Sequence, residues 1–280
     1  MLTFPIVDTH VHLWDISRFD YSWVKNVPLL NRSFVLSDFD AARGATDVGG
    51  MVFVTCVGDT AQWRDEIAWV QSLAKNEPRL KGIVGCVPVT DSQTALADLE
   101  AVRSRSGLLK GFRPWHRPMD DPKYVDFVRC LGRLDLTCDI CVPAEELADA
   151  ARLFTACPDV RFVLDHVGNP DIRKGSFEQW RRDLAEVAKC PHVTCKISGL
   201  ATRADHENWT REQLKPCIDY AIGCFGFDRV MFGGDWPVAA QAIEYPQWVQ
   251  TVTWAVEGCS DSERRKLFCD NSVGVYHLRP

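Results

Sequence analysis

The sequence predicts a (β/α)8 TIM barrel, and three observations lead to this fold class. Eight short apolar runs rich in β-branched residues occur along the 280 residues. Amphipathic stretches of helical period separate most of these runs. The length also fits such barrels, which typically have about 250 residues. The alternative is a doubly wound open sheet, which usually has a glycine-rich turn after its first strand, but this chain continues there with "HLWDISRFDYSW".

The predicted elements alternate along the whole chain, so we expect a single domain over residues 1–280. Helices are expected at residues 61–78 and 144–158, each closed by a proline, and in two segments that begin with capping-box spacing at Ser176 and Ser260. Residues 13–37 form the longest irregular piece, which we expect to lie over the barrel mouth. The predicted strands span residues 6–11, 50–55, 82–87, 108–112, 136–142, 161–164, 192–197 and 229–232.

Composition excludes several classes of function. The chain is 46% hydrophobic and 25% charged, with a formal net charge of −6, which is typical of a globular protein that does not bind nucleic acid. No apolar run is long enough for a membrane span, and no secretory signal is recognisable. The twelve cysteines lie largely in apolar runs, so we expect reduced core thiols in a cytoplasmic protein. The expected partner is a small-molecule substrate, and the sequence leaves a homo-oligomer open.

Polar side chains collect where the predicted strands end. In barrels of this class the active site lies at the carboxyl ends of the strands. A single histidine is more often a satisfied core residue, but five strand ends with polar groups predict an active site. Alternation along the first strand places Asp8, His10 and His12 on one face. The strand-end residues are His10 and His12, then Arg113, Trp115 and His116, then Asp165 and His166, then Lys196 and Ser198, and finally Asp235 and Trp236.

Four motifs resemble one known group of enzymes. "VDTHVHLWD", "DHVGNP", "KISGL" and "MFGGDWPV" occur in the order found in the amidohydrolase superfamily. More narrowly they resemble its branch of sugar-acid lactonases (L-fuconolactonase and L-rhamnonolactonase types) and 2-pyrone-4,6-dicarboxylate lactonase. The resemblance spans almost the whole chain and implies the same barrel fold. Carried over by motif, it implies that the catalytic residues, and the ligands of any bound metal, are His10, His12, His166 and Asp235.

The resemblance leaves the metal open. The larger superfamily often holds two metals with a lysine or glutamate at strand four and a histidine at strand five. Here strand four offers Arg113, and strand five ends in "CDICVP" without a histidine. One divalent ion, zinc or manganese, and a metal-independent site are therefore both compatible with the sequence. For Lys196 a buried structural salt bridge and a catalytic role are equally compatible with its position.

The predicted reaction is hydrolysis of a lactone, most simply a sugar-acid lactone of carbohydrate metabolism. Asp235 would act as the general base, and the three histidines would polarise the ester carbonyl. Arg113 without an obvious second arginine favours a neutral sugar lactone. The alternatives are a metal-dependent decarboxylase of an aromatic or unsaturated acid and a non-catalytic sugar-binding barrel. Candidate substrate contacts are Arg113, Trp115, His116, Trp236, Tyr21 and Trp23.

Overall fold

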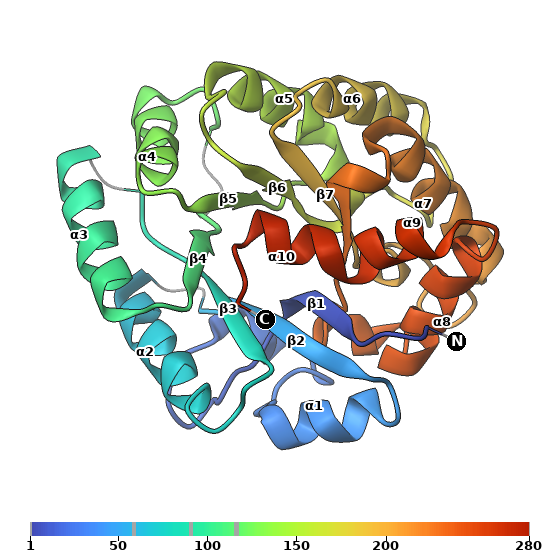
Figure 1. Ribbon diagram of the computed structural model, residues 1–280, viewed down its shortest axis with the longest axis horizontal. Coiled ribbons are helices and arrows are strands. Elements are labelled where there is room, and N and C mark those ends of the chain that lie inside the picture. Colours follow the sequence, from blue (N-terminus) through green and yellow to red (C-terminus); the bar gives the residue numbers. More distant parts are fainter. Residues whose placement is uncertain (1, 58–59, 90–91, 115–117, 280) are drawn as a thin grey trace.

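The computed structural model describes residues 2–57, 60–89, 92–114 and 118–279. Eight parallel strands lie side by side in chain order and form a barrel, which confirms the predicted fold class (Figure 1). Each strand begins and ends within two residues of its predicted bounds. The strands are β1 (Ile6–Val11), β2 (Val48–Val54), β3 (Leu80–Gly85), β4 (Leu109–Phe112), β5 (Thr137–Ile140), β6 (Phe162–Leu164), β7 (Val193–Ile197) and β8 (Val230–Phe232).

The barrel closes between β1 and the segment that follows β8. The backbone N–H of Asp235 donates to the carbonyl of His10 at 2.7 Å, and the N–H of His12 donates to the carbonyl of Trp236 at 2.8 Å. Four of the predicted site residues therefore belong to the hydrogen bonds that join the first strand to the segment after the last. The hydrogen bonds that close the barrel therefore also bring these site residues together.

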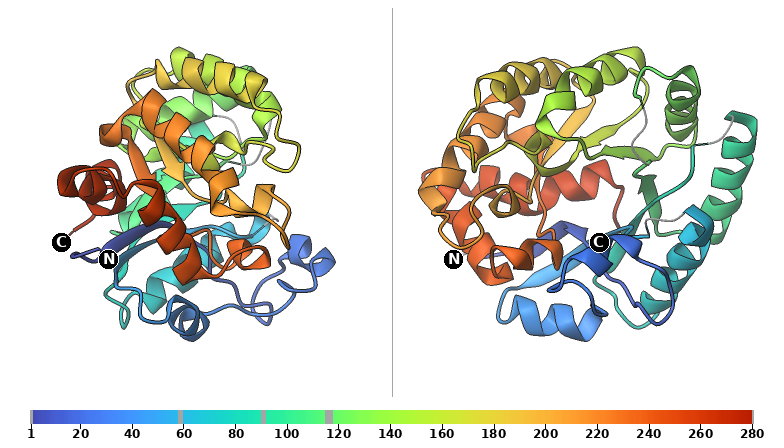
Figure 2. Two further views of the ribbon diagram at one scale, coloured as in Figure 1. Left: turned by 90° about the vertical axis from the view of Figure 1, so that its right-hand side faces the viewer. Right: turned by 180° about the vertical axis from the view of Figure 1, so that it is seen from behind.

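Helices surround the barrel on its outside (Figures 1 and 2). The capping box predicted at Ser260 forms, with the Ser260 hydroxyl accepting from the N–H of Glu263. The one predicted at Ser176 is wrong, because the helix begins later, at Glu178, and the Ser176 hydroxyl instead donates to the Glu178 carboxylate. The helices are α1 (Leu36–Arg43), α2 (Trp63–Leu73), α3 (Ser92–Arg105), α4 (Pro122–Arg133), α5 (Leu147–Ala156), α6 (Glu178–Ala188), α7 (Arg211–Phe225), α8 (Tyr245–Ala255), α9 (Asp261–Arg265) and α10 (Asn271–Val275).

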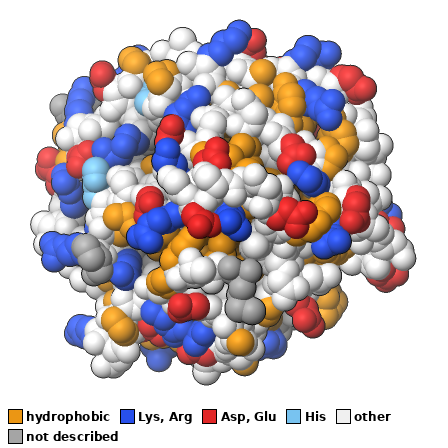
Figure 3. Space-filling view, turned by 45° about the vertical axis from the view of Figure 1, so that its right-hand side comes forward, with side chains coloured by type: hydrophobic (Ala, Val, Ile, Leu, Met, Phe, Trp, Pro, Cys, Tyr) orange, Lys and Arg blue, Asp and Glu red, His pale blue; other side chains and the backbone are white. Residues whose placement is uncertain are grey.

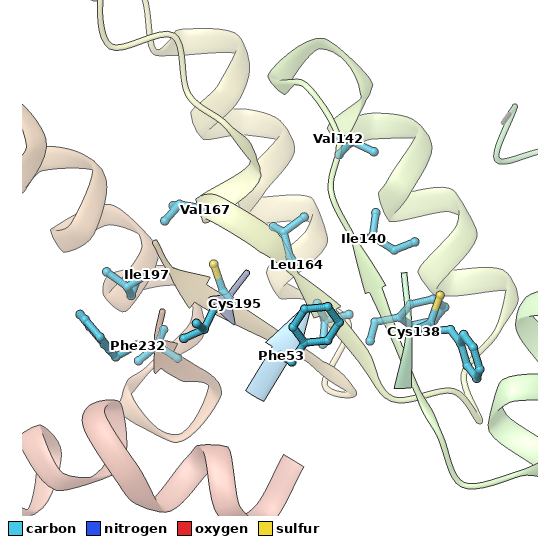
Figure 4. Packing of buried hydrophobic residues seen from close by; sticks show 14 of the residues in the cluster. Phe53, Cys138, Ile140, Val142, Leu164, Val167, Cys195, Ile197 and Phe232 are labelled. Carbon is cyan, nitrogen blue, oxygen red and sulfur yellow. The ribbon is translucent and has the colours of Figure 1, made fainter. Parts of the chain in front are cut away.

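Apolar side chains fill two layers. Outward-facing strand residues such as Phe53, Leu164 and Phe232 pack toward the helices, as Figure 4 shows. Inside the barrel, Tyr276 and Leu278 from the C-terminal segment close the amino end of the strands. Figure 2 shows the C-terminal helices on one side of the barrel and the loop that contains residues 13–37 on the opposite side. The C-terminal segment thus leaves the barrel open at the carboxyl ends of the strands. Inside the barrel, the apolar layer that contains Tyr276 and Leu278 also includes Val7, Val52, Val54, Val84, Val163 and Met231.

Strand β1 is bulged, which corrects the prediction for Asp8. Asp8 pairs with Met51 and Val11 with Phe53, so three steps along β1 match two along β2. The extra residue reverses the alternation. Val7 faces the barrel interior, whereas the Asp8 carboxylate accepts from the Tyr245 hydroxyl of α8 at 2.9 Å. Asp8 therefore does not share the face of the two histidines.

The surface shows no strong separation of charge on the face around α7, α8 and α9. There, lysine and arginine side chains alternate with aspartate and glutamate (Figure 3). Within the described ranges, no helix has the length and apolar character that crossing a membrane requires. All twelve cysteines lie in these ranges, and none of them forms a disulfide.

Candidate active site

A cavity of about 580 Å³ lies at the carboxyl ends of the strands. A larger depression of about 880 Å³ lies on the surface between α5 and α6, but it contains none of the predicted site residues and is open to solvent. Every strand, or the loop that follows it, contributes to the smaller cavity, so we take it as the candidate site. Its lining comprises His12, Trp23, Thr55, Cys56, Val57, Cys86, Arg113, Pro114, Cys141, His166, Asn169, Thr202, Arg203, His206, Asp235, Val238 and Gln241.

Three imidazoles converge on one carboxylate oxygen. The Oδ1 atom of Asp235 lies 3.7 Å from Nε2 of His10, 3.4 Å from Nε2 of His12 and 3.9 Å from Nε2 of His166. These residues lie at the carboxyl ends of strands one, six and eight, and barrel closure brings them together. The sequence analysis named this set of four, and the structure places them in one cluster.

The opposite nitrogen of each ring is anchored in the protein. His12 Nδ1 lies 2.8 Å from the carbonyl of Val54, and His166 Nδ1 lies 2.8 Å from Oγ of Ser198. His10 Nδ1 lies 3.3 Å from the Lys196 ammonium and 3.4 Å from Oδ1 of Asp165. Each ring is therefore held from behind, with Nε2 directed at Asp235. Such support of the far nitrogen is typical of histidines that bind metals.

The "KISGL" motif explains how the ring of His166 is seated. His166 has a φ of 54°, a left-handed conformation that non-glycine residues rarely adopt. Ser198 holds its Nδ1, and a Cβ atom on Gly199 would lie only 2.6 Å from that nitrogen. Gly199 is thus required for the close approach of the ring. Asp235 also has a φ of 54°, so two of the four site residues use this uncommon backbone conformation.

The donor set fits one divalent cation. A carbonyl only accepts, so His12 Nδ1 carries the proton and the neutral ring presents a lone pair on Nε2 to the Asp235 carboxylate. His12 Nε2 and Asp235 Oδ1 are then two acceptors 3.4 Å apart, and a cation between them stabilises this arrangement. His10 Nε2 is also buried and has no hydrogen-bond partner among the described residues. His10, His166 and Asp235 offer ligand atoms within 4.8 Å of one another, and imidazole with carboxylate suits zinc or manganese.

Charges in the cluster are strongly coupled. Burial raises the pKa of Asp235, but the charge of His166 and the neighbouring imidazoles of His12 and His10 outweigh it and bring the pKa to about 2. Burial lowers the pKa of His166, but the Asp235 carboxylate outweighs it and raises the pKa to about 9. Burial lowers the pKa values of His10 and His12. Without a metal, Asp235 is therefore ionised and His166 carries the compensating positive charge at neutral pH.

A buried ion-pair network contacts the Nδ1 side of His10. Lys196 is fully buried, and its ammonium lies 2.8 Å from Asp139 and 3.0 Å from Asp165. Asp139 also accepts a hydrogen bond from the hydroxyl of Tyr276. Lys196 thus forms the buried salt bridge that the sequence analysis left open, and the same ammonium contacts His10. Sequence reasoning missed Asp139 and Tyr276, although Asp139 is a lone carboxylate in the apolar run "LTCDIC".

The candidate substrate contacts fall into three groups. Trp23 and Arg113 line the cavity, with the Trp23 indole N–H donating to the carbonyl of Cys56 at 2.7 Å. Trp115 and His116 lie outside the described residues. Tyr21 and Trp236 are only 1% and 4% exposed and are absent from the lining. Trp236 instead packs edge-on against two phenylalanines, Phe34 and Phe39, so apolar burial places these rings behind the cavity wall.

The structure adds wall residues that were not predicted from the sequence. Many of them come from the loops after β5 to β8, and only Asn169 among these lies in a quoted motif, "DHVGNP". Arg203 matters most, because it is a second arginine in the cavity, in the 3-10 helix Ala201–Arg203 that follows β7. Arg203 lies six residues beyond the end of β7, outside the strand-end motifs and the first loop from which the candidates were taken. Further additions from these loops are Cys141, Asn169, Thr202, His206, Val238 and Gln241.

The fold and the cluster define a class: (β/α)8-barrel enzymes with three histidines and an aspartate at the carboxyl ends of the strands. The chain belongs to the Amidohydrolase family, whose model matches residues 7–278. It is 31% identical to an L-fucono-1,5-lactonase of Burkholderia multivorans, over 97% of this chain and 96% of the relative. A second L-fucono-1,5-lactonase, from Burkholderia ambifaria, is 25% identical over 99% of this chain and 97% of the relative.

A solved structure with the same fold contains zinc. The crystal structure of an amidohydrolase from Burkholderia multivorans with bound zinc superimposes with a TM-score of 0.87. It is 28% identical to this chain and covers 99% of it and 100% of its own length. The zinc belongs to that protein.

Proposed function

We propose that this chain is a hydrolase that opens the lactone ring of a sugar acid, a reaction at a carboxylic ester bond. The observation that carries the proposal is the convergence of three imidazole Nε2 atoms on Asp235 Oδ1, at 3.4–3.9 Å, at the cavity. Such a cluster combines an ionised carboxylate with groups that stabilise negative charge. The names of the two Burkholderia relatives support a lactone as the substrate.

Asp235 has two successive roles in this proposal. As an ionised carboxylate it takes a proton from the attacking water while the water oxygen bonds to the ester carbon. The carbonyl oxygen becomes an oxyanion, which the imidazole cluster stabilises. The C–O bond of the ring then breaks, and Asp235 returns the proton to the leaving alkoxide. The product is a hydroxy acid.

One divalent ion, zinc or manganese, is part of the proposal, held by His10, His166 and Asp235 with His12 alongside. When bound, it would supply a Lewis acid for the carbonyl oxygen. The proposal also places the enzyme in the reducing cytoplasm, which twelve free cysteines support.

A proton-release assay with sugar-acid lactones, including L-fucono-1,5-lactone, tests the proposal. Asp235→Asn should lower kcat by about a hundredfold or more, the usual scale for a lost general base. Asp228→Asn is the matched control, because this carboxylate is exposed and pairs with Lys266 away from the cavity. If wild type hydrolyses no lactone but releases carbon dioxide from an aromatic acid, the decarboxylase alternative replaces the proposal.

A further inference from the structure

Behind the cavity wall lies a buried carboxyl group that takes no part in the proposed chemistry. Glu66 belongs to α2, is fully buried and does not itself line the cavity. Burial raises the pKa of this carboxyl group to about 7. Removing such a group from water is costly unless hydrogen bonds compensate, so its position behind the wall calls for a specific set of donors.

The donors to Glu66 all belong to the segment that follows β2. Pairing with β3 continues as far as Thr55, whose N–H donates to the carbonyl of Val84 at 2.9 Å. The next two N–H groups, of Cys56 and Val57, each donate to Oε1 of Glu66 at 3.2 Å. The Thr55 hydroxyl donates to Oε2 of the same carboxyl group. Buried N–H groups need an acceptor, so Glu66 takes over where the neighbouring strand ends.

The carbonyl groups of this segment hold side chains of the cavity wall. The carbonyl of Thr55 accepts from Nη2 of Arg113 at 2.9 Å, and the carbonyl of Cys56 accepts from the indole N–H of Trp23 at 2.7 Å. Arg113 and Trp23 both line the cavity. A peptide group is planar, so fixing its N–H also fixes the carbonyl of the residue before it. Glu66 thereby orients both of the carbonyls that hold these two side chains.

The catalytic cluster is anchored one peptide group earlier. His12 Nδ1 lies 2.8 Å from the carbonyl of Val54, and the N–H of that same peptide group, on Thr55, donates to Val84 of β3. The barrel sheet therefore orients the carbonyl that serves His12. Glu66 orients the next two carbonyls, which serve the part of the wall that we expect to contact substrate.

We propose that Glu66 is a positioning residue of the active site, which directs Arg113 and Trp23 toward the substrate by holding the peptide groups between Thr55 and Val57. The inference rests on the proposed lactonase function, in which Arg113 and Trp23 contact the lactone. Because the base and the histidines are anchored elsewhere, loss of Glu66 should weaken substrate binding more than it slows the chemical step.

Steady-state kinetics of lactone hydrolysis test this role. Glu66→Leu fills a similar volume but accepts no hydrogen bond, so KM should rise about tenfold, the scale of a hydrogen bond lost from a charged group, while kcat changes less than about threefold. Glu66→Gln retains one acceptor oxygen and should recover most of the wild-type KM. Ile67→Ala is the matched control, because this apolar side chain is buried in the same helix and cannot hydrogen-bond to the segment. It should lower the melting temperature and leave KM unchanged.

A double-mutant cycle tests the route through the peptide groups. Trp23→Phe keeps an aromatic ring but removes the N–H that donates to the carbonyl of Cys56. The increase in KM caused by Glu66→Leu should be smaller in the Trp23→Phe background, by about threefold, because that carbonyl no longer positions a side chain. Should Glu66→Leu fail to fold, Thr55→Val takes its place, since it removes one donor to the same carboxyl group and should raise KM about threefold.

The outcomes separate the two proposals. An unchanged KM in Glu66→Leu, or in Thr55→Val where that variant replaces it, overturns the positioning role and leaves the lactonase function standing. An equal increase of KM in Ile67→Ala, or full additivity with Trp23→Phe, also overturns the positioning role. A wild type that hydrolyses no lactone refutes the lactonase function and, with it, a positioning role in that reaction.

Discussion

Nε2 of His12 faces Oδ1 of Asp235 at 3.4 Å, while the other nitrogen of the same ring donates to the carbonyl of Val54. The backbone of β2 thereby decides that a lone pair, rather than an N–H, points at the carboxylate. The contact is favourable only when a proton or a metal ion supplies positive charge. This relationship explains why the cluster fits a cation and leads to the first prediction.

Zinc should stabilise the chelator-treated protein against unfolding. Saturation to 100 times the dissociation constant contributes about 2.7 kcal/mol, because the ion binds the native cluster and not the unfolded chain. The measurement is the melting temperature with and without zinc. Asp235→Asn should abolish most of the increase, and magnesium should produce little, since it prefers oxygen ligands. An equal increase in Asp235→Asn would show that zinc binds elsewhere.

Lys196→Met should destabilise the fold strongly. The substitution leaves Asp139 and Asp165 buried without the ammonium that now pairs with both. Removing one partner of a buried ion pair costs about 3–5 kcal/mol, which urea unfolding measures. The double variant Lys196→Met with Asp139→Asn should recover part of the loss. No recovery, or a loss under about 1 kcal/mol, would contradict the network. Because the ammonium also contacts His10, kcat should fall.

Tyr276→Phe should lower the free energy of unfolding by about 1–3 kcal/mol. It removes the hydroxyl that donates to Asp139 and leaves a buried carboxylate with one donor fewer. Tyr220→Phe is the matched control, because its hydroxyl donates to the carbonyl of Arg181 at an exposed position. A control variant as unstable as Tyr276→Phe would refute a special role of the C-terminal segment in supporting the site.

Glu66 should make the protein less stable as the pH rises from about 4.5 to about 7. Burial raises the pKa of this carboxyl from 4.5 to about 7, although the backbone N–H groups of Cys56 and Val57 hydrogen-bond to it. In this interval the native state binds more protons than the unfolded state, so stability falls with increasing pH, by up to about 3 kcal/mol.

The measurement is urea unfolding of wild type and Glu66→Gln across this pH interval. Glutamine cannot titrate, so the difference in unfolding free energy between the two proteins isolates the contribution of Glu66. Asp8, whose pKa burial raises to about 6, remains in both proteins and cancels in this difference. A difference that is independent of pH would show that Glu66 titrates normally.

Local patterns in the chain were enough for the strands, because alternation and helical period are properties of neighbouring residues. They also located the four residues of the cluster, since each lies at or within three residues of the carboxyl end of a strand, and these ends meet at one end of a barrel. The resemblance of four motifs to those of the amidohydrolase superfamily identified these residues as candidate catalytic residues. None of these inferences needed a contact between distant residues.

The tertiary structure decided what depends on such contacts. The bulge that turns Asp8 away from His10 arises in the pairing of β1 with β2, and no local pattern contains it. Trp236 is buried because Phe34 and Phe39, far away in sequence, offer apolar partners. Asp139 meets Tyr276 across 137 residues, and Arg203 reaches the cavity through the fold of a loop. Periodicity is read from adjacent residues, whereas these relationships exist only once the barrel has closed.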